Sequence, residues 1–467
     1  MTQPTRRDFL TASAAAGATI ALAPFARPRG ANDDLRVAVV GFRGQGNLHI
    51  RCLRALPGVR VVALCDADRD VLDRGVKAAK DRNETVAGYT DVRKLLESKE
   101  VDAITTATPD HWHALVTIWA CQAGKDVYVE KPLCHNLWEG RKMVEAARKY
   151  DRIVQFGNQN HGVKTAELRL EMEGLGKIRA AVTNLSRLRK TIGKTDGPQP
   201  VPESVDYDLW CGPAPKDPLR RKALHYEWHW VWSTGTGELG NNGIYPLDAV
   251  RLAIGQSTLP KRVMSLGGRF LFDDDGQTPN TQIALFQYNP GPLVVFELWN
   301  LPSEKGPKLV GPGLRCEKGD SKLPTPPGKP GDTGGHTAHQ GHIFNFLSVV
   351  RSRKVADLRA DVLEGHLSTA LVHLANASYR VGTGHTVDRG RDAVKDRGPD
   401  AVEAFDRFRG HLEANGVDFA KTQVVVGPWL EVDPKREQFV GGDDTVSKAN
   451  ALLRPEYRAP FVVPDKV

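Results

Sequence analysis

The sequence predicts an α/β protein with two parts: an N-terminal doubly wound parallel sheet of the Rossmann type, and a C-terminal α/β domain with a large, mostly antiparallel open sheet. Three observations predict this class. Short apolar, β-branched runs alternate with helical patterns up to about residue 157, and the first run leads into a glycine-rich turn. Farther along, strand patterns follow one another with only turns between them, as in antiparallel sheets.

The chain of 467 residues is longer than one hydrophobic core usually serves, which predicts two domains behind a leader. We expect a signal peptide and linker over residues 1–33, a Rossmann domain over 34–157, a second domain over 158–386 and a C-terminal extension over 387–467. Hydrophobic residues make up 40% of the chain and charged residues 26%, as in globular proteins. The net charge of +8 is spread without a basic block, so we expect no nucleic-acid partner.

The N-terminus is similar to a twin-arginine export signal. Arg6 and Arg7 precede Asp8-Phe9-Leu10 and an alanine-rich apolar run that ends near Ala23. That run is shorter than the roughly 20 residues of a spanning helix. We therefore predict that the Tat translocase exports the protein to the periplasm or another extracytoplasmic space, with no stable membrane insertion after processing. A simple membrane anchor is the alternative.

The N-terminal strands are expected at the apolar runs, over residues 35–40, 59–65, 103–107, 127–129 and 153–156. Two helices have clear boundaries. One begins at Asp110 and ends at Gly124. The other begins at Asn136, with Glu139 at capping-box spacing, and ends near Lys149.

The second domain is expected to hold strands at 181–188, 263–272, 282–288 and 293–299, and helices at 337–351 and 361–381. Between them, the Gly/Pro-rich residues 302–335 predict a long loop. The tail beyond Val387 is polar, and we expect little regular order there.

Cysteine and histidine spacings indicate no metal site. The six cysteines form no C-x-x-C pair, and Cys52, Cys65 and Cys121 lie in apolar contexts that favour buried free thiols. His336, His339 and His342 have helical spacing, but no carboxylate pattern accompanies them. We therefore predict that no metal binds.

The glycine-rich turn predicts a dinucleotide site. Gly41-Phe42-Arg43-Gly44-Gln45-Gly46 follows the first strand directly, although its G-x-x-G-x-G spacing departs from the standard fingerprint and a plain tight turn is the alternative. Asp66 closes the second strand about 20 residues later, where a carboxylate binds the ribose hydroxyls. It would repel a 2′-phosphate, which favours NAD over NADP, while Arg43 and Arg69 would offset that repulsion.

Three blocks resemble the Gfo/Idh/MocA family, which includes glucose-fructose oxidoreductase and inositol dehydrogenase. They are Thr108-Pro109-Asp110-His111-Trp112-His113, the run from Ala123 to Glu130-Lys131-Pro132, and Gly235 to Asp248. The resemblance covers roughly residues 35–385, and the segments Asp274 to Thr281 and Glu364 to Ser368 resemble the exported bacterial branch. It implies a nicotinamide-dependent oxidoreductase acting on a sugar or polyol, with an open sheet that often forms an oligomer interface. We therefore expect a homo-oligomer, a dimer or tetramer.

The resemblance also implies further cofactor contacts. Thr108, Pro109 and His113 are expected near the nicotinamide, with His111 as a less favoured alternative to His113. Glu130 and Pro132, whose peptide bond is cis in family members, are expected to orient Lys131. Asn158, just past the last Rossmann strand, completes this predicted set.

Lys131, Tyr245 and Asn241 are the predicted catalytic residues. Lys131, with its pKa lowered beside a cationic nicotinamide, would take the hydroxyl proton from the carbinol. The usual family motif has an aspartate and, four residues later, a histidine, where this sequence has Asn241 and Tyr245. Asn241 can hold a hydroxyl but cannot exchange protons. Tyr245 can act as acid or base if Lys131 lowers its pKa, and packing on the sheet is the alternative.

Substrate contacts are expected from the domain crossing and from an aromatic segment. The predicted residues, besides Lys131, Asn241 and Tyr245, are Gln159, His161, Trp228, His229 and Asp248. Trp228 and His229 lie in Tyr226–Trp232, which would stack on a sugar ring or pack in the core. A hydrogen-bonded turn around His161 and a helix cap at Asp248 are the alternatives.

Three functions fit these residues. The first is reversible hydride transfer with a cofactor held tightly, because free NAD is scarce outside the cytoplasm. The second is a redox-neutral glycosidase or lyase that works through a transient keto-sugar. The third, suggested by Asn241, is a non-catalytic sugar-binding protein on a dehydrogenase fold.

Overall fold

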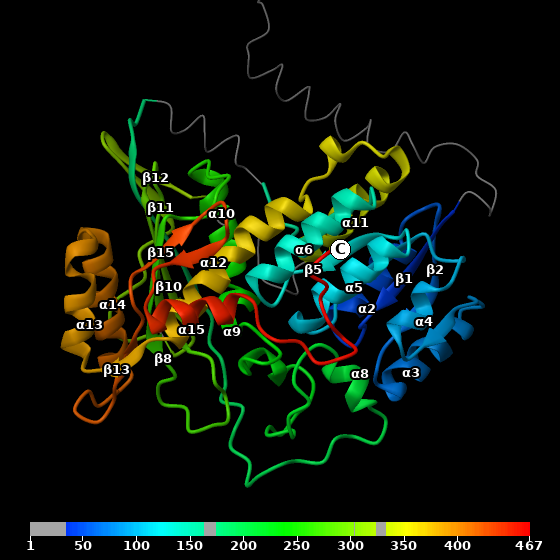
Figure 1. Cartoon of the computed structure of the whole chain (residues 1–467), viewed down its shortest axis with the longest axis horizontal. Coiled ribbons are helices and arrows are strands. Elements are labelled where there is room, and N and C mark those ends of the chain that lie inside the picture. The colour runs from blue at the N-terminus through cyan, green and yellow to red at the C-terminus, as the bar shows by residue number, and fades with distance from the viewer. Residues whose placement is uncertain (1–33, 163–173, 303, 324–332) are drawn as a thin grey trace, which may run out of the picture.

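The computed structural model describes residues 34–162, 174–302, 304–323 and 333–467. Figure 1 shows a parallel sheet with its helices, in blue and cyan, beside a larger sheet in green to orange. The export signal lies outside the described residues. None of the described helices is long and apolar enough to cross a membrane.

The first sheet has the strand order β3-β2-β1-β4-β5-β6, and its neighbouring strands run parallel. The strands are β1 Leu35–Val40, β2 Val59–Cys65, β3 Ala87–Tyr89, β4 Ala103–Thr106, β5 Asp126–Glu130 and β6 Val154–Gly157. The predicted Rossmann sheet is therefore confirmed. The short strand β3 was not predicted, because Ala-Gly-Tyr carries no apolar run.

Helices pack on both faces of this sheet, and side-chain N-caps begin three of them, at Asp68, Asp91 and Asn136. They are α2 Gln45–Arg54, α3 Arg69–Lys80, α4 Val92–Leu96, α5 Asp110–Gln122 and α6 Leu137–Lys149. The Asn136 side chain accepts a hydrogen bond from the Glu139 amide at 3.0 Å, so the predicted N-cap of α6 is confirmed.

The second sheet is mixed and mostly antiparallel, as predicted. Its central strands are β7 Ile178–Ser186, β8 Arg262–Gly268, β9 Thr281–Gln287 and β10 Leu293–Trp299, and only β7 and β10, among the described pairs, run parallel. The predicted loop 302–335 is wrong over part of its length. It contains a hairpin of β11 Gly313–Cys316 and β12 Gly319–Lys322 at the sheet edge, where the exposed, polar β12 shows no apolar alternation.

Helices from the second half connect the two sheets. They are α8 Tyr207–Cys211, α9 Gly237–Asn241, α10 Ile244–Ala253, α11 Thr333–Ser352 and α12 Val362–Arg380. The long helix α12 packs against α6 on one side and β8 on the other, and α11 packs beside α2. Both halves of the chain therefore build the space at the carboxyl ends of the parallel strands.

The C-terminal tail is ordered, so the prediction of weak order there is wrong. It forms β13 Thr383–His385, α13 Val387–Val394, α14 Pro399–Ala414, β14 Val424–Val426, β15 Leu430–Asp433, β16 Gln438–Val440 and α15 Asp444–Leu453. Strands β14 and β15 pair with β8. The helical spacing of Phe405, Phe408 and Leu412, all fully buried, was the overlooked signal.

Helix α14 covers the outer face of the second sheet. Phe405 and Phe408 join an apolar cluster with residues of β8, β9 and β10, and Arg407 Nη2 lies 2.7 Å from the buried Glu297 carboxylate on β10. Figure 1 shows α13 and α14 outermost on this side. The outer face of the sheet is therefore covered by a helix of the same chain. The expected homo-oligomer stays a prediction. All six cysteines are buried and unbridged, as expected for the three in the first domain.

Candidate active site

A cavity of about 1460 Å³ lies between the carboxyl ends of the parallel strands and the second domain. Small-molecule sites usually measure about 300–1,000 Å³, so this cavity has room for more than one drug-sized molecule. The predicted residues that line it are Gly41, Phe42, Arg43, Gly44, Gln45, Asp66, Thr108, Pro109, His113, Glu130, Lys131, Gln159, Trp228, His229, Asn241 and Tyr245. The structure therefore brings both predicted halves of the site together.

The glycine turn leaves bare backbone at the start of α2. Gly41 has φ +70°, and a Cβ there would lie 2.8 Å from the Thr108 amide nitrogen, so only glycine fits. Gly44 is the N-cap of α2, and no atom lies within 4 Å of the position of its missing Cβ. Gly46 does not line the cavity, because it packs α2 against the Gly41 carbonyl. This geometry suits a phosphate at the helix N-terminus.

Asp66 follows β2 and faces the same cavity. Its carboxylate accepts hydrogen bonds from the amides of Phe42 and Asp68, each at 3.1 Å. Burial raises the pKa of Asp66 to about 6, despite these two hydrogen bonds. Arg43 and Arg51 also line this end of the cavity, and Arg51 was not predicted from the sequence. The donor set of bare amides, one carboxylate and two arginines fits the phosphates and ribose of a dinucleotide.

Glu130 is held as a carboxylate by its neighbours. Its Oε1 lies 3.0 Å from His49 Nε2 and accepts a 3.0 Å hydrogen bond from Gln45 Nε2. Burial alone would raise the pKa of Glu130, but the contact with His49 and nearby positive charges outweigh it and hold the pKa at about 2. The Lys131 amide donates to Glu130 Oε2 at 3.1 Å, which fits the predicted orienting role.

Lys131 lies at the junction of the two halves. Its Nζ donates to the Asn241 carbonyl oxygen at 2.6 Å and to Asn241 Oδ1 at 3.2 Å, and it lies 5.4 Å from the centre of the Tyr245 ring. Burial lowers the pKa of Lys131, although the charge of Glu130 partly opposes this. The Lys131–Pro132 peptide bond is cis, as the resemblance implies.

His113 faces the cavity, whereas His111 does not. His113 Nδ1 lies 2.7 Å from the Pro132 carbonyl oxygen and Nε2 lies 3.0 Å from that of Thr108. Pro132 therefore helps to place His113 without lining the cavity itself. His111 lies between the carbonyl oxygens of Trp210 and Thr234, on the wall of a different cavity.

Tyr245 is not tuned as the sequence hypothesis required. Burial raises the pKa of its phenol well above the ordinary value, and the hydrogen bond with Gln159 opposes this only in part. Burial therefore opposes the predicted lowering of this pKa by Lys131. A buried phenol with a raised pKa stays protonated at neutral pH, so it suits hydrogen-bond donation.

Asp110 was predicted only as the start of a helix, yet it lines the cavity and is 2% exposed. It accepts a 2.7 Å hydrogen bond from the Thr236 hydroxyl. Burial raises the pKa of Asp110 to about 7, although Thr236 and the charge of Lys131 lower it. Arg187 is a second cation on the wall and donates to Asn242 Oδ1 at 3.0 Å. Neither role has a local motif, because each arises from chain segments far apart in sequence.

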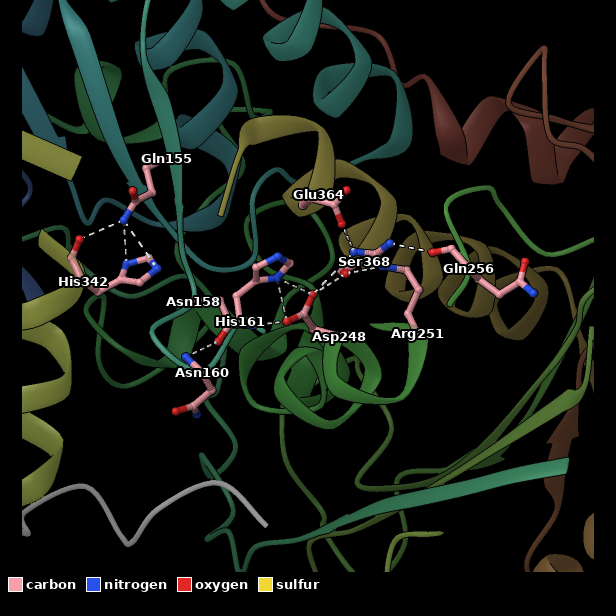
Figure 2. Close-up of polar contacts among 10 residues, drawn as sticks. All are labelled: Gln155, Asn158, Asn160, His161, Asp248, Arg251, Gln256, His342, Glu364 and Ser368. Atoms are coloured by element: carbon pink, nitrogen blue, oxygen red, sulfur yellow. Dashed lines mark hydrogen bonds and ion pairs between the residues drawn. The ribbon is translucent and has the colours of Figure 1, made fainter. Parts of the chain in front are cut away.

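Asn158, His161 and Asp248 form a buried network off the cavity, shown in Figure 2. Asn158 Nδ2 donates to Asp248 Oδ2 at 2.8 Å, and His161 Nδ1 lies 3.0 Å from the same carboxylate. Ser368 donates to Asp248 from α12 at 2.5 Å. These contacts fix the loop that presents Gln159 and Asn160 to the cavity. Asn158, His161 and Asp248 themselves do not line the cavity, so in this arrangement they are not placed for the predicted ligand contacts.

The aromatic segment is divided among three environments. Trp228 and His229 line the cavity with their rings stacked 3.6 Å apart, Trp230 is buried, and Trp232 lines the other cavity. Of the three histidines on α11, His339 reaches the first cavity, with Nε2 3.0 Å from Gln45 Nε2, and His342 is buried against Gln155. The side chain of His336 lies outside the described residues.

Two family models match the chain. Residues 35–158 match an oxidoreductase family described as having an NAD-binding Rossmann fold, and residues 181–402 match the C-terminal alpha/beta domain of that oxidoreductase family. Together they cover about three quarters of the chain. Residues 3–23 match the twin-arginine translocation signal, which confirms the predicted export route.

Curated relatives match over part of their length. A glycosyl hydrolase family 109 protein of Saccharopolyspora erythraea is 29% identical over 196 residues, which are 36% of this chain and 43% of that protein. An inositol 2-dehydrogenase from the same organism is 35% identical over 131 residues, 25% of this chain and 38% of that protein. The chain thus aligns with less than half of each relative.

Solved structures share the fold. The WlbA dehydrogenase from Bordetella pertussis, in complex with NADH and UDP-GlcNAcA, has a TM-score of 0.55 at 18% identity, covering 74% of this chain and 97% of that one. The myo-inositol dehydrogenase from Lactobacillus casei, in complex with NAD(H) and myo-inositol, has a TM-score of 0.54 at 16% identity, covering 74% and 95%.

Proposed function

The chain belongs to the Gfo/Idh/MocA family of oxidoreductases, and on that premise we propose that it transfers a hydride between a sugar or polyol carbinol and a tightly held nicotinamide dinucleotide. The observation that carries this proposal is the position of Lys131. Its part-buried ammonium group lies in one cavity with the glycine turn of the first domain and with Asn241 and Tyr245 of the second. A binding protein without chemistry has no need of that arrangement.

Lys131 is the proposed proton acceptor. When bound, the nicotinamide ring supplies the hydride acceptor or donor. Burial increases the neutral fraction of Lys131, which can then take the hydroxyl proton of a carbinol as the hydride leaves. Asn241 holds Nζ through two oxygens and thereby aims it. Tyr245, which stays protonated, donates a hydrogen bond to the substrate oxygen instead of moving a proton.

NAD is the preferred dinucleotide in this proposal. Asp66 lines the cavity at the end of β2, where its carboxylate would accept hydrogen bonds from ribose hydroxyls and repel a 2′-phosphate. Arg43 and Arg51 lie near enough to line the same end, so the preference is tested by measuring which dinucleotide the purified protein carries.

A redox-neutral glycosidase is the second candidate. The observation that favours it is the similarity to a glycosyl hydrolase family 109 protein, 29% identical over 196 residues. In such a reaction, oxidation of one carbinol acidifies the neighbouring C–H, and loss of that proton expels the aglycone by elimination. Water then adds to the resulting double bond, and the hydride returns to the keto carbon. The same Lys131 site would serve both reactions.

One experiment separates the candidates. Protein purified after export is denatured to release and quantify its dinucleotide, and intact protein is then mixed with sugars, polyols and glycosides while nicotinamide absorbance is recorded. Persistent reduction by a free sugar or polyol supports the oxidoreductase. Release of an aglycone without net reduction supports the glycosidase. Absence of both dinucleotide and turnover would reject both.

A further inference from the structure

A second cavity, of about 690 Å³, lies on the other side of the segment Thr234–Thr236. The start of α6, residues around α8, the last turn of α12 and the C-terminal tail line it. Trp210 contributes to both cavities, and Thr236 of the second cavity donates its hydroxyl to Asp110 of the first. The two chambers are therefore separated by one layer of residues, and this second one is not used by the proposed hydride transfer.

Arg221 is the most unusual residue in this cavity. It is only 5% exposed, and its guanidinium lies 5.3 Å from the centre of the Trp210 ring. Nη2 donates to the Leu224 carbonyl oxygen at 3.2 Å, whereas Nε has no partner. Across the described ranges, no carboxylate lies within ion-pair distance of Arg221. The charge of Glu227 acts on Arg221 only from beyond ion-pair distance. A buried charge is costly unless it is paired, so this guanidinium has no direct counter-ion in the described structure.

Arg380 is a second guanidinium of the lining, and it is exposed at the cavity mouth. It is the last residue of α12, and its guanidinium lies 5.0 Å from the centre of the Trp232 ring. It forms no ion pair with any carboxylate in the part of the chain that the structure describes. Together with the exposed Arg220, three guanidinium groups border this chamber without an ion pair among the described residues.

The carboxylates in this cavity do not supply the missing charge. Glu139 accepts a hydrogen bond from the His135 amide at 2.8 Å, and burial raises the pKa of Glu139 to about 8, so it is largely neutral at pH 7. Asp275 accepts hydrogen bonds from the amide and hydroxyl of Thr195, each at 2.8 Å. Asp217 and Glu456 are exposed. Among the described residues, none of these four carboxylates forms an ion pair with Arg221 or Arg380, so both guanidinium groups remain available to an incoming anion.

The rest of the lining suits a sugar ring. The volume is within the range of small-molecule sites, about 300–1,000 Å³. Trp232, Trp210 and Tyr207 supply flat apolar surface, and Asn376 and Thr236 supply polar groups between α12 and the segment that separates the cavities.

We propose that this second cavity binds a sugar ring that carries an oxyanion, either a carboxylate or a phosphate, with Arg221 and Arg380 holding the anion. Planar guanidinium groups are the side chains best matched to both oxyanions. The proposal does not depend on hydride transfer, since its readout is binding.

The test is calorimetric titration of the full, dinucleotide-loaded protein. Glucuronate and glucose 6-phosphate are the probes, with glucose and inorganic phosphate as partial mimics. We expect at least one acidic sugar to bind, with glucose at least tenfold weaker because it lacks the charge-assisted contacts. Tighter binding of glucuronate would identify a carboxylate ligand, and tighter binding of glucose 6-phosphate a phosphate ligand. Binding of neither acidic sugar would overturn the proposal.

Variants locate the site. Arg221→Met and Arg380→Met should each weaken binding of the acidic sugar at least tenfold, whereas Arg74→Met, at an exposed arginine of α3, should not. If Arg221→Met fails to fold, Arg221→Lys and the more exposed Arg380→Met decide the question. Lys131→Met should bind as the natural chain does. Loss of binding in Lys131→Met with retention in Arg380→Met would place the anion in the first cavity and overturn the proposal.

Discussion

The two walls of the large cavity are built on different principles. The Rossmann wall presents backbone: Gly41 turns at a positive φ, Gly44 leaves the start of α2 uncovered, and Asp66 ends a strand. The second-domain wall presents side chains whose properties depend on burial, such as Tyr245 and its raised pKa. A backbone site is encoded by a few closely spaced residues, whereas an electrostatic site is set by everything packed around it.

Lys131 joins the two walls, and its replacement should have the largest effect. Lys131→Met removes the proposed proton acceptor, and general acid–base groups contribute about 10²–10⁴-fold, so kcat should fall by that factor. The dinucleotide should remain bound, because the glycine turn and Asp66 are unchanged. Stopped-flow reduction and dinucleotide content would be measured beside Lys77→Met, an exposed lysine of α3. Undiminished turnover would mean that Lys131 is not the proton acceptor.

A pair of glycine variants sharpens the backbone side of the comparison. Gly41→Ala forces a Cβ to 2.8 Å from the Thr108 amide nitrogen at a positive φ, so the free energy of unfolding should fall by about 1–3 kcal/mol. Gly44→Ala adds a methyl group in open space and should leave unfolding nearly unchanged. Because that methyl lies where α2 begins, it should still reduce dinucleotide content.

Denaturant unfolding and dinucleotide content measure both effects. Equal destabilisation by the two substitutions would mean that the turn is a structural feature without a ligand. Equal dinucleotide content in Gly44→Ala and the natural chain would mean that no phosphate of the dinucleotide binds at the N-terminus of α2.

The sequence predicted the backbone wall well and the side-chain wall in part. Gly41, Asp66 and Lys131 were found because strand ends and short motifs fix their positions. Asp110 was missed as a titrating group because its burial depends on Thr236, which is 126 residues away. Asn158, His161 and Asp248 were expected on the cavity surface, but they bond to one another instead, since no local pattern tells which side of a loop faces a ligand. The order of the tail was missed because its core residues lie among many charges.

Asp110→Asn tests whether buried charges set the titration of Lys131, where the two walls meet. Ionised Asp110 favours the charged form of Lys131, so removing the carboxylate should lower the pKa of Lys131 further. The rising limb of kcat/KM with pH should therefore move to lower pH, by up to about one unit. Asp73→Asn, at an exposed position of α3, is the matched control. If the rising limb of kcat/KM stays in place or moves to higher pH, Asp110 does not favour the charged form of Lys131 in the proton-transfer step.

The same variant makes a prediction about stability. The pKa of Asp110 is raised from 3.8 to about 7 by burial, so the folded protein holds a proton that the unfolded chain releases. Stability from this group is present below the unfolded value and is lost as pH rises from about 4 to about 7. The thermal unfolding temperature of Asp110→Asn should therefore fall less over that pH interval than the unfolding temperature of the natural chain.

Tyr245→Phe should have the smallest effect, because the phenol is proposed to donate a hydrogen bond and not to move a proton. A lost neutral hydrogen bond of about 0.5–1.5 kcal/mol lowers kcat/KM by about two- to tenfold. The pH profile should keep its shape, because burial raises the pKa of Tyr245 far from neutrality. Tyr245→His, which restores the usual family residue, should instead add a new ionisation near neutral pH. A fall in kcat/KM of more than a hundredfold in Tyr245→Phe, with a changed pH profile, would mean that Tyr245 also moves a proton. The proton transfer would then depend on both Lys131 and Tyr245.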